Sequence, residues 1–383
     1  MIVELHMVQN FAPGNLNRDD TGAPKDCEFG GTRRARISSQ CLKRSMRELV
    51  RERGLVGETN LGMRTRRLVG LVAGELQRRG KDAAEAEAVA DAVLAALDLQ
   101  SANAGTSDFL VFISPKEIGL VADVCEANWS ELAEVANSAA TPAKGKKRAY
   151  KLPATIKSEM TKALDASSAV DISLFGRMIA TAPELNVEAA SQVAHAISTN
   201  RVSMEFDFYA AVDDLQSDEE SGAGMLGTVE FNSSCYYRYS NLDVGQLQHN
   251  LAGDPELTRM AIAAFVEGSI LAVPSGKQNT FAAHNPPSLV LAEVRDGQPI
   301  SMANAFVSPV VSGRGQDLVR ESIERLARYR ERVGAVYGMP AAAGVITTEE
   351  ELPPSLKRQQ LATVSDLVGL VLREVVGEAA DLG

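Results

Sequence analysis

The sequence predicts an α+β fold in which a ferredoxin-like core is interrupted by a large helical insertion. The first observation is a strand pattern followed by an amphipathic helix near the N-terminus. The second is a stretch rich in Ala, Leu, Glu and Arg at 61–181, and the third is the return of strand and helix patterns after residue 200. With 383 residues, 45% of them hydrophobic, the chain can bury one elaborated domain or two smaller ones.

The first strand is expected at residues 2–9, where Val3, Leu5 and Met7 share one side of an extended segment and more polar residues share the other. This alternation predicts a half-buried strand. Residues 10–37 are rich in Gly, Pro, Asn and Asp, so they predict a long, turn-rich loop. Long ordered loops are usually functional.

A helix is expected over residues 38–53, because a serine can cap its start and a glycine follows its end. Leu, Met and Val residues at helical spacing give it a face for burial. Lys43, Arg47 and Arg51 are four residues apart, so they line one side of the helix.

The later elements are inferred from periodicity. Alternation at 201–209 and 228–239, with a polar and glycine-rich stretch between them, predicts a long hairpin with a mobile tip, and 288–294 suits a buried strand. Outside the insertion the order is strand, helix, strand, strand, helix, strand, which RNA-recognition domains share. Further helices are expected at 64–80, 83–99, 116–138, 243–272, 315–334 and 355–376.

The net charge of −11 is unevenly distributed. Eight basic and two acidic residues lie between Arg33 and Arg53, and the run 144–151 holds five bases and no acid. An acidic cluster lies at 213–220. Such segregation permits local phosphate binding on an acidic protein.

Several classes of function are disfavoured. There is no apolar run long enough to cross a membrane and no signal core at the N-terminus, so the chain is expected to be cytoplasmic. The four cysteines and four histidines are scattered, and we expect neither a metal site nor a cofactor. The sequence contains no Walker loop, dinucleotide fingerprint or nucleophile elbow, which disfavours a metabolic enzyme.

Residues 18–53 combine features that suit a polyanion. The pair Gly30-Gly31 lets backbone amides approach a phosphate, the arginines offer planar donors, and the helix start adds unpaired amides and a favourable dipole. The alternative is a solvated basic helix face paired with acidic residues elsewhere.

The stretch from Gln9 to Gln40 carries a family resemblance. It contains Leu-Asn-Arg-Asp-Asp-Thr-Gly at 16–22 and Phe-Gly-Gly-Thr-Arg-Arg-Ala-Arg-Ile-Ser-Ser-Gln at 29–40, and it closely resembles the backbone subunit of the type I-E CRISPR Cascade complex, the CasC or Cas-seven family. Further matches lie at 174–178, 192–196, 207–215 and 237–239.

The resemblance implies an RRM-like palm formed by 1–60 and 182–383, helical fingers at 61–181, and a hairpin thumb at 199–228 within the palm. It also implies a non-catalytic subunit that polymerises head-to-tail along a CRISPR RNA and presents this guide to target DNA. Implied partners are other Cascade subunits and a recruited helicase-nuclease, and no membrane is expected.

The expected RNA contacts come from two sources. The family's contacts carry over to Arg18, Lys25, Ser38, Gln40, Lys43 and Arg47, with Met178 wedged against bases. Donor chemistry in the same stretch adds Asn17, Arg33, Arg34 and Arg44, and a loop after Pro274 adds Lys277, Gln278 and Asn279.

Two further sets have an ordinary structural alternative. Met204, Phe206 and Phe208 form a stripe at strand spacing that is most often core, although the thumb position makes them candidates for base wedging. The basic run could touch target DNA or be a solvated loop of the fingers; its candidates are Lys144, Lys146, Lys147 and Arg148.

A guide-directed, metal-dependent ribonuclease is the rival function. Related backbone subunits of type III complexes use an aspartate in the corresponding loop, so Asp19 and Asp20 are the residues to suspect. Both can equally pair with nearby arginines. The first strand lacks an aromatic platform, which suits a protein that holds the RNA backbone and leaves its bases free to pair. Because the long match is to the type I-E form, we expect no catalysis.

Overall fold

A computed structural model describes residues 1–99, 110–138, 150–165, 169–211, 225–311, 317–338 and 341–377. The chain divides into two compact units. The sheet unit comprises Met1–Glu52, Gln192–Asp243 and Ile262–Gly383, and the helical unit comprises Arg53–Ser191 and Val244–Ala261. The assignment of palm, fingers and thumb remains a prediction. The described part of the chain contains no helix with the length and hydropathy that crossing a bilayer requires.

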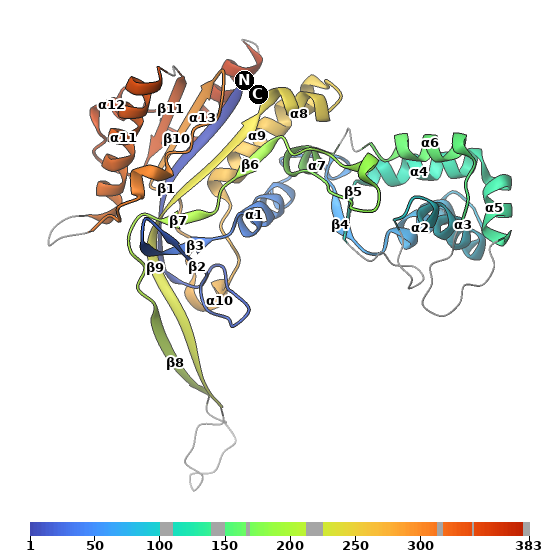
Figure 1. The fold of residues 1–383 in the computed structure, drawn as a ribbon, viewed down its shortest axis with the longest axis horizontal. Helices are drawn as coiled ribbons and strands as arrows, with labels where there is room; N and C mark the ends of the chain where they lie inside the picture. The colour runs from blue at the N-terminus through green and yellow to red at the C-terminus, as the bar shows by residue number, and fades with distance from the viewer. Residues whose placement is uncertain are drawn as a thin grey trace, which may run out of the picture. The chain divides into compact units, whose positions relative to one another are not determined.

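The sheet unit is built on an antiparallel sheet with the order β11-β10-β1-β9-β7-β3-β2 (Figure 1). Its central order, β10-β1-β9-β7, is that of the ferredoxin-like fold, so the predicted fold class is confirmed. The strands are β1 (Ile2–Gly14), β2 (Asp26–Phe29), β3 (Thr32–Ile37), β7 (Ala196–Ser198), β9 (Met225–Asp243), β10 (Leu289–Arg295) and β11 (Ala342–Thr347). The short strand β6 (Ser191–Val193) also pairs with β9.

Helices cover both faces of this sheet. On one face, α11 (Leu318–Tyr337) packs through Ile323 and Leu326 against a core that includes Tyr237 of β9. On the other, α1 (Ser39–Glu52) and the C-terminal part of α9 (Pro255–Leu271) pack together. As a result, β1 is buried on both faces from Ile2 to Val8, and the prediction of a half-buried strand is wrong.

An ionic network lies beneath α11. Glu4 and His6 of β1 are fully buried beside Glu293 and Arg295 of β10. Arg295 Nε lies 2.6 Å from Glu4 Oε2, and Arg330 of α11 donates to Glu293 Oε1 at 2.8 Å. Desolvation lowers the pKa of His6 to about 4, so it is neutral at pH 7. Charged groups at this depth persist because each carboxylate has a guanidinium partner.

A long hairpin leaves the sheet where β8 (Glu205–Ala211) pairs with the first half of β9 (Figure 1). β8 begins four residues later than predicted, and the predicted tip, which contains the acidic cluster at 213–220, lies outside the described residues. Phe206 and Phe208 are 67% and 66% exposed, so the interpretation of these two as core is wrong. Met204 is half-buried and packs against a core cluster.

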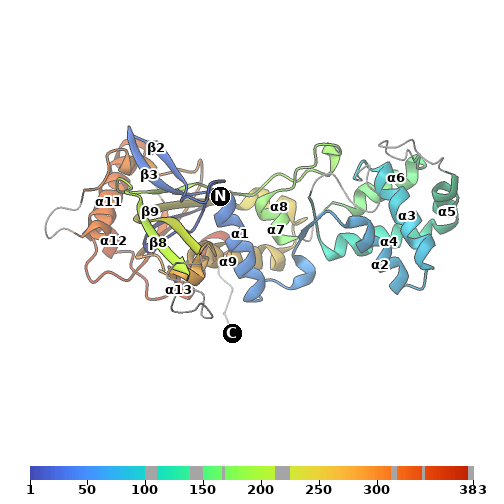
Figure 2. The same cartoon turned by 90° about the horizontal axis from the view of Figure 1, so that it is seen from below.

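Helices of the predicted insertion lie together in the helical unit (Figure 2), and their buried apolar side chains form a core cluster. Ser114 and Glu117 form a capping box that starts one of these helices. The predicted helix at 116–138 is divided in two at Asn128. The elements are β4 (Met63–Thr65), β5 (Val111–Ile113), α2 (Leu68–Arg78), α3 (Ala83–Ala96), α4 (Pro115–Ala127), α5 (Trp129–Ser138), α6 (Ala154–Ala163), α7 (Val170–Phe175) and α8 (Val244–Asn250).

Among the described residues, seven strands were not predicted, namely β2, β3, β4, β5, β6, β7 and β11. β2 and β3 form a hairpin inside the stretch expected to be a loop. The helix expected at 355–376 is two helices, α12 (Pro354–Lys357) and α13 (Val364–Val376). The remaining short elements are α10 (Gln278–Phe281) and the 3₁₀ turns Glu58–Asn60, Pro183–Leu185 and Ala303–Phe306.

Candidate nucleic-acid interface

The loop between β1 and β2 is held closed by its own polar groups. Asn15 Nδ2 donates to the carbonyl oxygens of Gly22 and Glu230, at 2.9 and 3.0 Å. The Lys25 N–H donates to the carbonyl of Asn17 at 2.8 Å. The loop that carries the Asn-Arg-Asp-Asp string is therefore ordered against the sheet, which fixes where its exposed side chains lie.

Asp19 stabilises a turn in this loop. Its Oδ1 accepts hydrogen bonds from the Thr21 N–H at 2.9 Å, the Thr21 hydroxyl at 2.8 Å and the Ala23 N–H at 3.0 Å. The hydrogen bond from the Thr21 hydroxyl is the main cause that lowers the pKa of Asp19. Among the described residues, neither Asp19 nor Asp20 belongs to a group of three potential metal ligands. The geometry thus gives Asp19 a structural task.

Three amides at the start of α1 already have acceptors inside the protein. The Ser38 N–H donates to Asn17 Oδ1 at 2.8 Å, and the Cys41 N–H donates to the Ser38 hydroxyl at 3.3 Å. The Ser39 N–H donates to Nδ1 of His195 at 2.9 Å. The expectation of unpaired amides is therefore wrong for these three groups. Asn17 and the largely buried Ser38 position the helix and the loop relative to each other.

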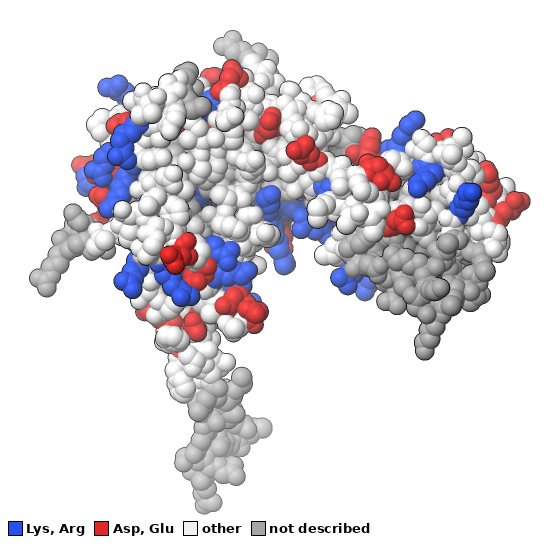
Figure 3. Space-filling model, viewed as in Figure 1, with Lys and Arg blue, Asp and Glu red and all other residues white. Residues whose placement is uncertain are grey.

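Cationic side chains surround this helix start. Arg18, Arg33 and Arg44 are exposed, and Lys25 is half-buried. Arg33 pairs with Asp26 at 2.5 Å and Arg44 with Glu48 at 2.7 Å. Such exposed pairs contribute little free energy, so a phosphate can replace the carboxylate partner. Figure 3 shows Lys and Arg side chains, with some acidic ones among them, gathered where Figure 1 places β2 and β3.

The basic side of α1 matches the predicted pattern. Leu42, Ser45, Met46 and Val50 are buried. At 100° per residue, the opposite side carries the polar residues of the helix. Gln40 there is exposed, and the set comprises Gln40, Lys43, Arg44, Arg47 and Arg51. We call the exposed and half-buried polar side chains of the loop 15–25, β3 and α1 together the basic surface.

Arg34 is not part of this surface, which corrects the prediction. Its side chain is fully buried, and its guanidinium donates to four backbone carbonyls at 2.8 to 3.1 Å: those of Ser198, Thr199, Phe306 and Val307. Gly30, expected to admit a phosphate, has φ +59°, and a Cβ there would collide with the carbonyl of Val307. Both residues hold the β2–β3 hairpin onto the sheet unit.

The loop around α10 lies beside the basic surface. The Gly276 backbone approaches the carbonyls of Asn15 and Leu16 so closely that a Cβ would not fit. An open pocket of ≈ 550 Å³ lies between this loop, the loop 16–22 and α1, and Ser275 and Arg44 are among its lining residues. In the same loop, Lys277 directly follows Gly276, and Asn279 is two residues further along the chain.

Gln278 has a task within its own loop. Its Nε2 donates to the carbonyl oxygens of Pro274 and Ala283, at 2.9 and 3.2 Å. We therefore assign it to loop closure, which differs from its predicted RNA contact. Lys277 adopts a left-handed conformation with φ 51° and is half-buried, whereas Asn279 is exposed.

The other predicted contacts lie elsewhere. Met178 is 83% exposed in the helical unit, next to Arg177, which is buried and pairs with Glu117 at 2.6 Å. The basic candidates Lys144, Lys146, Lys147 and Arg148 lie outside the described residues.

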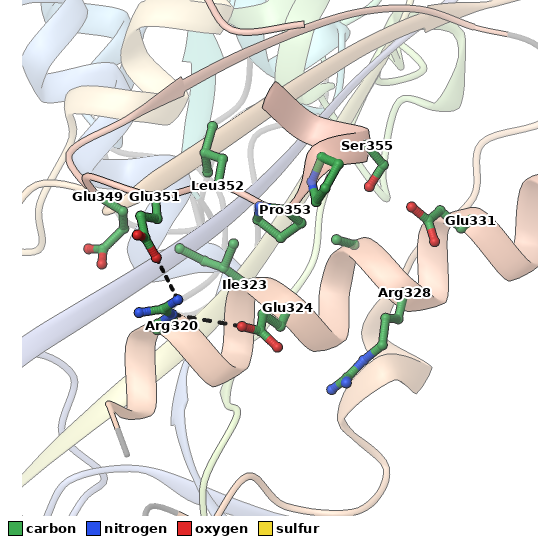
Figure 4. Close-up of a pocket in the computed structure, with 12 residues that line it drawn as sticks. Arg320, Ile323, Glu324, Arg328, Glu331, Glu349, Glu351, Leu352, Pro353 and Ser355 are labelled. Atoms are coloured by element: carbon green, nitrogen blue, oxygen red, sulfur yellow. Dashed lines mark hydrogen bonds and ion pairs between the residues drawn. The ribbon is translucent and has the colours of Figure 1, made fainter. Parts of the chain in front are cut away.

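A separate pocket of ≈ 390 Å³ lies between α11 and residues 349–355 (Figure 4). Arg320 is one of the residues that line it. Its Nη2 lies 2.7 Å from Glu351 Oε2, and its Nε lies 3.7 Å from Glu324 Oε1. Arg320 thus pairs with two of the carboxylates that line the pocket, and burial raises the pKa of a third, Glu349.

Comparison with known proteins adds a family and a fold. The CT1975-like protein family matches the chain over residues 3–371. A solved chain described as "CRISPR RNA-guided surveillance complex, pre-nicking" is 31% identical, with a TM-score of 0.83, and the match covers 98% of this chain and 100% of that chain. Another, described as "CRISPR RNA-guided surveillance complex", is 26% identical, with a TM-score of 0.74 and the same coverage. No curated protein matches the chain.

Proposed function

The chain belongs to the CT1975-like protein family, and we propose that it is a guide-RNA-binding backbone subunit of a CRISPR surveillance complex. The observation that carries the proposal is the basic surface, where Arg18 and Arg44 line one open pocket and Lys25 lies near the start of α1. The string from Gln9 to Gln40 supports the finer assignment to the type I-E Cascade form.

The surface suits a sugar-phosphate backbone better than bases. Its cations can replace their exposed carboxylate partners with phosphates and release counterions from the RNA. None of the residues that line the ≈ 550 Å³ pocket is aromatic, so stacking of bases is not available there. A guide held in this way keeps its bases free to pair with target DNA, which then supplies the sequence specificity.

Exposed apolar side chains would act on the bases instead. Phe206 and Phe208 lie on the same side of β8, where an unpaired aromatic surface is costly unless a partner covers it. We assign them to wedging between base pairs of the guide–target duplex. Met178, whose side chain is 83% exposed, is the corresponding candidate in the helical unit.

The partners follow from the same assignment. Copies of the chain would bind head-to-tail along one CRISPR RNA, a heterologous contact that leaves an open array. Other Cascade subunits, target DNA and a recruited helicase-nuclease complete the proposed set, and the complex would work in the cytoplasm.

We assign no catalytic step to this subunit. The hydrogen bonds of Asp19 stabilise the loop, which leaves Asp20 as the remaining suspect for a ribonuclease. The guide-loaded protein should leave complementary RNA intact in the presence of Mg²⁺. Metal-dependent cuts that disappear in Asp20→Ala would establish the ribonuclease function instead.

The salt dependence of RNA binding tests the proposal. Arg18→Gln and Lys25→Gln each remove one cation, so each should lower the slope of log affinity against log salt by about 0.7 for single-stranded RNA. Arg320→Gln, which removes an exposed, ion-paired arginine from α11, is the matched control and should leave the slope unchanged. Slopes equal to that of the wild type in both Arg18→Gln and Lys25→Gln would contradict phosphate binding at this surface.

A further inference from the structure

His195 lies at the basic surface, between β6 and β7, and the phosphate contacts proposed for that surface do not include it. Its side chain is exposed, yet its Nδ1 accepts the Ser39 N–H of α1 at 2.9 Å. This hydrogen bond joins residues 156 positions apart in the sequence. An exposed histidine that is fixed in this way has one ring nitrogen committed to the protein and the other one available.

The hydrogen bond determines the protonation of the ring. A neutral imidazole has one donor and one acceptor nitrogen, and a protonated one has two donors. Because Nδ1 accepts from Ser39, the proton must lie on Nε2. Partial desolvation of the ring lowers the pKa of His195, and the cations Arg36 and Lys25 lower it further, so the neutral ring is favoured. The available nitrogen is therefore a donor.

The surroundings of this donor indicate its ligand. Arg36 and Lys25 lie close enough to act on the ring electrostatically. The backbone N–H of Arg36 donates to the carbonyl of Lys25 at 2.9 Å, so the two residues are held side by side. A ring N–H beside two cations matches an anionic oxygen that can accept a hydrogen bond, as phosphate oxygens do.

We propose that His195 is an RNA-binding residue whose Nε2–H donates to a phosphate oxygen of the guide, beside the phosphate contacts of Lys25 and Arg36, while its Nδ1 holds the start of α1. This inference rests on the proposed function and adds a neutral donor beside the cations of the basic surface. The two ring nitrogens have separate tasks, so they can be tested separately.

Two substitutions divide the two tasks. In His195→Asn, the amide oxygen can replace Nδ1 and accept the Ser39 N–H, but nothing occupies the position of Nε2. In His195→Gln, the longer side chain can place its amide nitrogen near the position of Nε2. His195→Ala lacks both groups. Thermal unfolding of each variant measures the hydrogen bond to the helix, and RNA affinity measures the phosphate contact.

We expect His195→Asn to unfold at the wild-type temperature. His195→Asn and His195→Ala should each bind RNA about tenfold more weakly than the wild type, because a hydrogen bond to a charged group is removed. His195→Gln should regain most of this affinity. The loss should be the same factor at every salt concentration, because a neutral donor releases no counterions, whereas Lys25→Gln lowers the slope.

Other results would overturn the inference. Equal RNA affinities in His195→Asn and His195→Gln would show that the outward nitrogen does not bind RNA. A salt slope lowered by His195→Asn would show that the ring acts as a cation. In both cases, a reduced salt slope in Lys25→Gln would leave the proposed function intact. A wild-type protein that binds no RNA would contradict both the inference about His195 and the proposed function.

Discussion

The ionic network beneath α11 and the basic surface at the start of α1 contain the same kinds of side chain: histidine, arginine and carboxylate. In the network, His6 is fully buried, Glu4 is paired with the buried Arg295, and Glu293 is paired with the half-buried Arg330. At the basic surface, ion pairs such as that of Arg33 are exposed, and His195 keeps one ring nitrogen available. The degree of burial, and not the residue type, therefore distinguishes the ionic network, which stabilises the fold, from the basic surface, which is proposed to bind RNA.

The comparison also bears on metal binding. Within the described ranges, Glu4, His6 and Glu293 are the group whose ligand atoms lie within 4.8 Å of one another, as a metal site would require. Two guanidinium groups already balance the two carboxylates. A divalent cation would add uncompensated charge in a buried position, so the geometry favours a purely structural network.

Adjacent arginines of β3 give the largest expected contrast. Arg34→Ala should destabilise the sheet unit by about 3–5 kcal/mol, because four buried carbonyls lose their donor. Arg33→Ala should cost less than about 1 kcal/mol, because its ion pair is exposed. Urea unfolding followed by hydrogen exchange of sheet-unit peptides measures both. Similar losses of unfolding free energy in the two variants would contradict the assignment of Arg34 to the buried structure and of Arg33 to the surface.

His6 should make stability depend on pH. Its pKa is about 4 in the folded protein and 6.5 when unfolded, so the unfolded chain binds more protons between these values. The contribution is complete above pH 6.5 and is lost as the pH falls toward 4, by about 3 kcal/mol in total. Burial raises the pKa of Glu4, which acts in the opposite direction.

The difference between the wild type and His6→Gln isolates the contribution of His6. Unfolding free energies at pH 7 and pH 4.5 should show a smaller pH-dependent loss in His6→Gln than in the wild type. The same loss in both proteins would show that His6 is not held neutral by burial.

The exposed phenylalanines should affect binding with little effect on stability. Phe206→Ser with Phe208→Ser should weaken target capture by the guide-loaded complex, by about 1–3 kcal/mol for each base that no longer stacks on an aromatic ring. Stability should change by less than about 0.5 kcal/mol, because both side chains lie at the surface. Val311→Ser, at a residue 70% exposed in the same unit, is the matched control. Capture unchanged from the control would contradict base wedging.

Much of the fold could be predicted from the sequence because its longer helices and the strands β1, β9 and β10 have clear periodicity, whereas β7 is only three residues long and was missed. The helix at 39–52 begins and ends where its serine and glycine indicate. The hairpin of β2 and β3 was missed because arginines and glycines hide its alternation; Arg34 points into the protein, and only tertiary contacts reveal its partners. Burial of Glu4 was also hidden, because its partner Arg295 is far away in the sequence.

The site shows the same division. Basic residues at helical spacing predicted the exposed side of α1, where local geometry decides the result. His195 lies in the family match at 192–196, but its hydrogen bond could not be predicted, since its partner Ser39 comes from a distant segment. The roles of Asn17, Gln278 and Asp19 in closing loops depend on which backbone groups the fold brings near, which residue type alone does not specify.

Sequencing of the RNA that co-purifies with the protein tests the central claim most directly. The basic surface contacts the RNA backbone and leaves the bases free, so it does not select a base sequence. The bound RNA should instead be the guide on which the complex assembles. We expect CRISPR repeat-and-spacer transcripts, depleted when Arg18 and Lys25 are replaced together by Gln. A population of unrelated cellular RNAs, or no RNA at all, would contradict a guide-RNA backbone subunit.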